Sequence, residues 1–164
     1  MRMVNLTEKH TISCLVENHF GVLARVSSLI SARGFNIDSL TVSATEDPTI
    51  SRMTIVVDAD GPKLEQVKNQ LNRLIDVIEV QELKEGEFID RELLLVRVRA
   101  TDNTKTQLEQ VVKQCGGKFA STTGESVVIE AAGDTKVLDQ LVEQLRPHGI
   151  TKLVRTGRVA LEKK

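Results

Sequence analysis

The chain has 164 residues, 40% hydrophobic and 27% charged, a balance typical of a folded protein of one domain or two small ones. Its only aromatic residues are four Phe, which disfavours stacking on single-stranded nucleic acid and removes any catalytic Tyr. The net charge of −1 lacks the basic excess of a protein that binds phosphate backbones, so we expect no nucleic acid partner.

Residues 1–10 lack the apolar run of a signal peptide, and no stretch reaches the roughly 18 apolar residues of a membrane span. Cys14 and Cys115 are far apart and show no CxxC spacing, so we expect buried thiols in a reducing compartment. The three histidines show no metal-binding spacing. These patterns predict a cytoplasmic protein with no membrane contact and no metal site.

The first half of the chain alternates between the apolar periods of strands and helices. Gly34 is placed to end the first helix, and Asp60-Gly61-Pro62 opens the second, whose buried stripe extends to Ile75. The predicted elements are strand 11–16, helix 21–34, strand 37–45, strand 50–57, helix 61–75 and strand 77–83.

The same order recurs in the second half, after a charged segment at 84–91 that we interpret as a linker. A capping box at residues 104–107 opens the first helix of this half, and Asp134 caps the second. The predicted elements are strand 92–100, helix 104–115, strands 118–123 and 126–132, helix 135–145 and strand 150–155.

Two βαββαβ units in tandem define an α+β protein of ferredoxin-like folds, with units at 10–83 and 92–164. In each unit two helices cover one face of a four-stranded sheet. Ile12, Met53 and Ile55 are predicted on the face without helices, which then requires another cover. Because units of this size are marginally stable alone, we expect self-association through sheets or edge strands.

Charge is unevenly distributed along the chain. Residues 76–92 carry seven acids and two bases, whereas the tail at 146–164 carries six bases and one acid. Each segment is either a solvated surface or a docking surface for a partner.

The connection between the first strand and the first helix contains the most informative residues. Gly21 lies where the chain must turn sharply, and the amides that follow it suit a carboxylate. Asn18 and Asn36 offer amide donors and acceptors, and Ile37 adds an aliphatic wall. This set suits a zwitterion with an aliphatic side chain, although Asn18 and Gly21 equally suit a tight loop without a ligand.

An enzyme of the same topology is a second possibility. An acylphosphatase-like hydrolase needs an arginine near the first helix and an asparagine on the following strand, and Arg25 and Asn36 meet that description. The simpler interpretation of Arg25 is a solvated charge on the helix. An RNA-recognition module is disfavoured because strand 50–57 has no aromatic residue for stacking.

Longer motifs identify a family. Residues 16–26, VENHFGVLARV, resemble the ligand loop of ACT domains. Residues 33–42, RGFNIDSLTV, and 47–55, DPTISRMTI, resemble the small regulatory subunits of acetolactate synthase, also called acetohydroxyacid synthase. Residues 92–98, ELLLVRV, resemble the start of the second domain of that family.

This resemblance implies a regulatory role with no active site in the chain. Members of the family bind the catalytic large subunit of acetolactate synthase, raise its activity and confer feedback inhibition by a branched-chain amino acid, usually valine. The cofactors thiamine diphosphate, magnesium and FAD are then expected on the catalytic partner, and none on this chain. The resemblance also implies a homodimer formed through ACT domains.

The implied effector site lies between two chains. Residues Asn18, Phe20, Gly21, Val22 and Leu23 come from one chain, and Asn36 and Ile37 from the other. Phe20 stands where many ACT domains have Pro, which changes the rigidity expected of the loop.

The equivalent loop of the second unit, residues 100–104, has no glycine. We therefore expect no effector site in that unit, and assign it to dimer support or docking.

Overall fold

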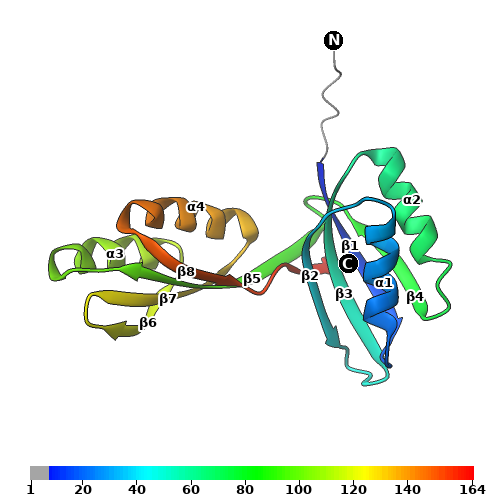
Figure 1. Ribbon diagram of the computed structural model, residues 1–164, viewed down its shortest axis with the longest axis horizontal. Helices are drawn as coiled ribbons and strands as arrows, with labels where there is room; N and C mark the ends of the chain where they lie inside the picture. Colours follow the sequence, from blue (N-terminus) through cyan, green and yellow to red (C-terminus); the bar gives the residue numbers. More distant parts are fainter. Residues whose placement is uncertain (1–7) are drawn as a thin grey trace, which may run out of the picture. The chain divides into compact units, whose positions relative to one another are not determined.

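The structure, a computed structural model, describes residues 8–164, so most of the stretch 1–10 predicted to lack a signal peptide lies outside it (Figure 1). The described chain divides into two compact units. The first holds the residues up to Phe88 together with Ala160–Lys164, and the second holds Ile89–Val159. Within the described range, no helix is long and apolar enough to cross a membrane.

The first unit is a four-stranded antiparallel sheet with both of its helices packed on one face (Figure 1). The strand order is β2-β3-β1-β4, so β2 and β4 are the edge strands. Its elements are β1 (Glu8–Glu17), α1 (Val22–Ala32), β2 (Ile37–Ala44), β3 (Ile50–Ala59), α2 (Gly61–Leu71) and β4 (Val77–Leu83).

The second unit repeats this arrangement with the strand order β6-β7-β5-β8, and a further short strand, β9, pairs with β5. The α+β class of two ferredoxin-like units is therefore confirmed. Its elements are β5 (Phe88–Arg99), α3 (Asp102–Gln114), β6 (Lys118–Thr123), β7 (Ser126–Gly133), α4 (Thr135–Leu145), a 3₁₀ turn (Arg146–His148) and β8 (Ile150–Arg155). The residues of β9 (Val159–Glu162), apart from Val159, are grouped with the first unit.

The core of the first unit lies between the sheet and its helices. Ile12, Met53 and Ile55 are at most 1% exposed and belong to the same cluster as Val26 of α1 and Leu64 of α2. The prediction that these three strand residues face away from the helices is therefore wrong. Because β3 is apolar at several consecutive positions, its alternation does not identify the face that the helices cover.

The ends of α2 and α3 differ from the sequence prediction. α2 ends at Leu71, and Ile75 is 94% exposed instead of lying on the buried stripe, because the chain has already turned toward β4. α3 begins at Asp102 instead of residue 104. The cap lies one turn earlier because the N–H of Thr101 donates to the hydroxyl of Thr104 at 2.9 Å.

The segments on either side of the second unit are also more regular than predicted. β5 begins at Phe88, within the segment 84–91 predicted as a linker, and β9 lies in the basic tail. The N–H of Lys163 donates to the carbonyl of Glu87 at 3.0 Å, and Ala160 is buried. The tail therefore supplies a pairing partner that no local pattern reveals.

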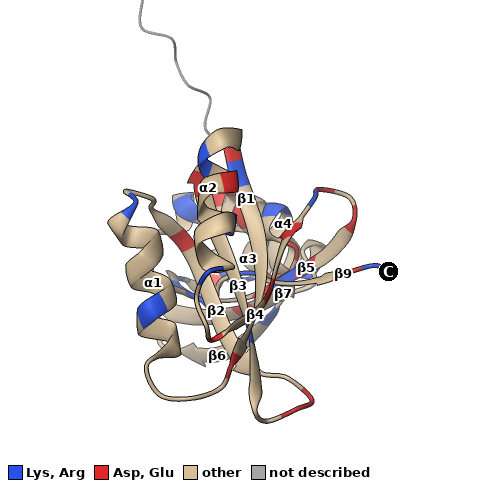
Figure 2. Cartoon of the chain, turned by 90° about the vertical axis from the view of Figure 1, so that its right-hand side faces the viewer, with Lys and Arg blue, Asp and Glu red and all other residues tan. Residues whose placement is uncertain are grey.

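In the cartoon of Figure 2, the positions of Lys and Arg (blue) and of Asp and Glu (red) are spread along the elements among uncharged residues (tan).

Candidate functional site

The loop between β1 and α1 is fastened to the turn between β2 and β3. The N–H of Asn18 donates to the carbonyl of Thr49 at 2.7 Å, and its side-chain Nδ2 donates to the carbonyl of Pro48 at 2.9 Å. Among the described residues the side-chain carbonyl of Asn18 has no hydrogen-bond partner, so it can accept from a ligand. The loop ends at Gly21, whose φ of +85° is a conformation that side chains other than glycine rarely adopt.

The N-terminus of α1 is open. Gly21 stands at its cap position, and no side chain caps the helix. The first turn holds no acidic residue, and the N–H of Val22 reaches the carbonyl of His19 only at 3.5 Å, so the N–H groups there can receive a carboxylate. Phe20 is fully exposed and Leu23 is 42% exposed, whereas the side chain of Val22 is buried in the core. Of Val22, therefore, only the main chain can contribute to a site.

Asn36 and Ile37 lie at the other end of the same unit. Glu17, next to Asn18, pairs with Ile50 of β3, whereas Ile37 pairs with Val57. Seven residues of β3 separate these two levels, which is about 24 Å at 3.4 Å per residue. The seven predicted site residues therefore form two groups that one chain does not bring together.

The second group is solvent-accessible and polar at its start. The side chain of Asn36 is exposed, and its Nδ2 donates to the carboxylate of Asp38 at 3.1 Å. Ile37 begins the edge strand β2 and is half-buried, so part of its side chain is available to a neighbour. Phe35, just before them, is buried in the core and fixes where this segment leaves α1.

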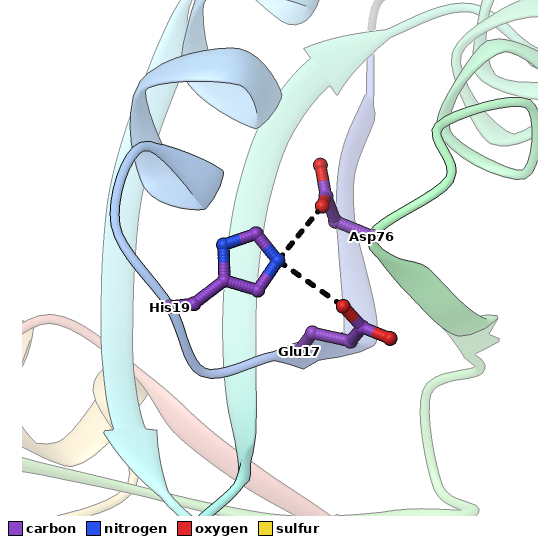
Figure 3. A group of neighbouring side chains, drawn as sticks. All are labelled: Glu17, His19 and Asp76. Atoms are coloured by element: carbon purple, nitrogen blue, oxygen red, sulfur yellow. Dashed lines mark hydrogen bonds and ion pairs between the residues drawn. The ribbon is translucent and has the colours of Figure 1, made fainter.

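A cluster of charged side chains adjoins the loop (Figure 3). Nε2 of His19 lies 3.1 Å from the carboxylate of Glu17 and 3.0 Å from that of Asp76. Because carboxylates only accept, this nitrogen carries a proton in these contacts, while Nδ1 faces the carbonyl of Phe20 at 3.2 Å. Nε of Arg25 donates to the other oxygen of Asp76 at 2.7 Å. Arg25 is therefore not the simply solvated charge that the sequence suggests.

Asp76 is the buried member of this cluster, with a side chain 7% exposed. The hydrogen bond from Arg25 is the main cause that lowers the pKa of Asp76, and the charge of His19 lowers it further. One ligand atom each from Glu17, His19 and Asp76 lie within 4.8 Å of one another, a spacing that also suits a cation. However, the internal ion pairs already account for this arrangement.

Sequence reasoning missed this cluster. Glu17 and His19 are two residues apart, but Asp76 comes from the connection before β4 and is joined to them only by the fold. No spacing rule links a residue in one connection with another almost sixty positions later.

Arg25 and Asn36, the pair considered for an acylphosphatase-like hydrolase, do not lie together within one chain. Arg25 lies in the first turn of α1, whereas Asn36 follows the end of that helix. From residue 25 to the helix end at Ala32 alone is about 10 Å at 1.5 Å per residue. Each side chain is also engaged, Arg25 by Asp76 and Asn36 by Asp38.

The corresponding region of the second unit is closed. Only two residues, Ala100 and Thr101, separate β5 from α3, compared with four between β1 and α1. Thr101 and Thr104 bond to each other at the helix start, and neither has a positive φ. This unit therefore lacks the glycine turn and the open helix end of the first.

Two ferredoxin-like units, the first with an open glycine loop at a helix N-terminus, define a protein of the ACT-domain class. Residues 12–79 match the family model described as "AHAS small subunit-like ACT domain", and residues 91–164 match that of "Small subunit of acetolactate synthase".

Related proteins resemble the chain along almost its whole length. The acetolactate synthase small subunit of Mycolicibacterium smegmatis is 46% identical over 98% of this chain and 95% of its own. A probable acetolactate synthase small subunit of Archaeoglobus fulgidus is 44% identical over 93% and 96%. The crystal structure of the small subunit from Thermotoga maritima has a TM-score of 0.86 and 32% identity, covering 96% of this chain and 98% of that one. The chain belongs to the acetolactate synthase small subunits, which are regulatory and non-catalytic.

Proposed function

We propose that two copies of this chain bind valine, or another branched-chain amino acid, between their first units and thereby impose feedback inhibition on acetolactate synthase. The site takes Asn18, Phe20, Gly21 and Leu23, with the main chain of Val22, from one copy. It takes Asn36 and Ile37 from the other copy.

The observation that carries this proposal is the separation of the two groups along β3. β2 is an edge strand, and its start lies at the Asn36 level while its end, Ala44, pairs with Ser51 near the Asn18 level. If two β2 strands pair antiparallel about a two-fold axis, the start of one lies beside the end of the other. Two equivalent sites then form, each with both groups.

The chemistry of the residues suits an aliphatic amino acid. The open N–H groups of α1 receive the carboxylate. The side-chain oxygens of Asn18 and Asn36 accept from the ammonium group, since Nδ2 of each is already engaged. Leu23 and Ile37 supply partly exposed aliphatic surface for a branched side chain.

The effector acts on a partner chain. The proposed partner is the catalytic large subunit of acetolactate synthase, the enzyme that the relatives' names mention. Thiamine diphosphate, magnesium and FAD are then expected on that partner, as the sequence resemblance implies. A coupling free energy of about 1–3 kcal/mol between effector and partner suffices for feedback. We place the complex in the cytoplasm. The proposed effector domain is 10–83, and the proposed second domain, 92–164, supports the dimer or docks the partner. Between them lies the predicted linker 84–91, whose residues from Phe88 on belong to β5.

Reconstitution with a catalytic large subunit tests this function. The chain should raise synthase activity, and valine should lower the activity of the complex but not that of the large subunit alone. Calorimetric titration of the isolated chain with valine, leucine and isoleucine then ranks the effectors. Activation without any response to these amino acids would contradict the proposed feedback, and no activation would contradict the proposed partner.

A further inference from the structure

Asp76 fastens three consecutive parts of the loop region to the connection between α2 and β4. Its carboxylate accepts from Arg25 through one oxygen and from His19 through the other. Its main-chain carbonyl accepts from the N–H of Glu17 at 2.9 Å. One residue thus holds the end of β1, the loop and the first turn of α1. Figure 3 shows the loop contact, in which His19 points toward Asp76.

The arginine that Asp76 holds lies directly beside the glycine turn. A Cβ built on Gly21 would lie 3.2 Å from Nη1 of Arg25, so the guanidinium borders the turn. The side chain of Arg25 is 47% exposed, and its Nε bond to Asp76 is what fixes its direction. Without that carboxylate a long side chain on an exposed helix face samples several rotamers.

The buried carboxylate remains charged at neutral pH, since the hydrogen bond from Arg25 keeps its pKa below the usual value. Charge-assisted hydrogen bonds of this kind are stronger and more directional than neutral ones. Asp76 therefore holds both donors in defined places.

We propose that Asp76 is the positioning residue of the effector loop: by holding His19 and Arg25 it keeps the Gly21 turn and the N–H groups of α1 ready for the effector carboxylate. This inference rests on the proposed function. Asp76 itself does not touch the effector. The loop is then already ordered in the folded chain before the effector binds. Because binding does not have to order it, the effector affinity is higher.

The second unit offers a matched control. The side chain of Glu92 is 6% exposed, close to the 7% of Asp76, and it also pairs with an arginine, Arg155. Its other oxygen accepts from the N–H of Gly157 at 3.1 Å. Glu92→Gln therefore disturbs an equally buried ion pair in the unit without the open loop.

Calorimetric titration of the full-length chain with valine tests the proposal, using wild type, Asp76→Asn and Glu92→Gln. We expect Asp76→Asn to raise the Kd by about tenfold or more, and Glu92→Gln to leave it within about twofold. Thermal unfolding of both variants measures the stability cost, which should be similar. Arg25→Lys keeps the positive charge but loses the directed Nε bond, and we expect it to weaken valine binding severalfold. If Asp76→Asn does not fold, Arg25→Lys still tests the proposal.

The outcomes separate the two proposals. If wild type binds none of the three branched-chain amino acids, the proposed function fails. If wild type binds but Asp76→Asn and Arg25→Lys bind equally well, the positioning role is overturned. Equal loss of affinity in Asp76→Asn and Glu92→Gln would also overturn it, because a purely structural role then explains both.

Discussion

At the scale of single residues, Gly21 is the position where the candidate site is most sensitive. Gly21→Asp adds a carboxylate beside the open N–H groups of α1, where it occupies and repels the place of the effector carboxylate. We expect valine affinity to fall by more than about tenfold, or about 1.4 kcal/mol, measured by calorimetry.

The matched control is Gly21→Ala. In both variants a residue with a Cβ must adopt the φ of +85°, which costs roughly 1–2 kcal/mol in stability, but only Asp adds charge. Alanine should therefore share the loss of thermal stability and keep more of the affinity. Equal affinity of Gly21→Asp and wild type would remove the loop from the site.

The two cysteines should differ sharply in reactivity. Burial raises the pKa of Cys14 from 9.0 to about 12, whereas Cys115 is only half-buried. Near pH 8 the thiolate fraction of Cys14 is then roughly a thousandfold lower than that of a free thiol. Iodoacetamide followed by mass spectrometry should label Cys115 in the folded chain, and Cys14 only after unfolding in urea.

The same pKa shift has a consequence for stability. Below about pH 9 the thiol is protonated in both the folded and the unfolded chain, so it does not change the free energy of unfolding. Between about 9 and 12 the unfolded chain releases this proton and the folded one retains it, so stability falls as pH rises. Labelling of Cys14 in the folded chain at the rate of Cys115 would contradict its placement in the core.

The sequence predicts the conformation or burial of a single residue where that property depends on its neighbours in the chain. The positive φ of Gly21 follows from a glycine between a strand and a helix, and the burial of Cys14 from an apolar strand. In contrast, Arg25 meets Asp76 only because α1 and the start of β4 lie together in the folded unit. A contact across that sequence distance has no local signal.

At the scale of elements, helix caps contribute measurable stability. The carboxylate of Asp60 accepts from the N–H of Lys63 at 3.0 Å and caps α2. Asp60→Ala should cost about 1 kcal/mol, which lowers the melting temperature by about 2–4 °C in circular dichroism. Asp58 is exposed on β3 and has no side-chain partner among the described residues, so Asp58→Ala should change little. Equal effects of the two substitutions would argue against the cap.

Element order was predictable, and element ends were not. The changes of apolar period, the segment Asp60-Gly61-Pro62 and the cap at Asp134 mark where elements begin, and the structure confirms the cap at Asp134. Ile75 continues the apolar period of α2, but lies in the turn beyond the helix. β9 could not be predicted, because a four-residue strand exists only through pairing with β5.

At the scale of the whole molecule, effector binding and self-association should be a single equilibrium. Since the two residue groups lie about 24 Å apart in one chain, neither binds the effector fully alone. Valine should then stabilise the dimer by mass action, by about 2.7 kcal/mol at one hundred times its Kd. The two edge strands of the first unit allow this link to be tested without disturbing the core.

Val42 on β2 is 43% exposed and Ile78 on β4 is 53% exposed, so either can become Lys with little cost to the monomer fold. If dimers form through β2, Val42→Lys places two charges near the axis and should weaken both dimerisation and valine binding. Ile78→Lys should leave both unchanged. Sedimentation velocity with and without valine measures dimerisation, and calorimetry measures valine binding. If Val42→Lys loses valine binding but keeps the dimer, a β2 interface is disproved. The same holds if Ile78→Lys weakens dimerisation and valine binding while Val42→Lys leaves both unchanged.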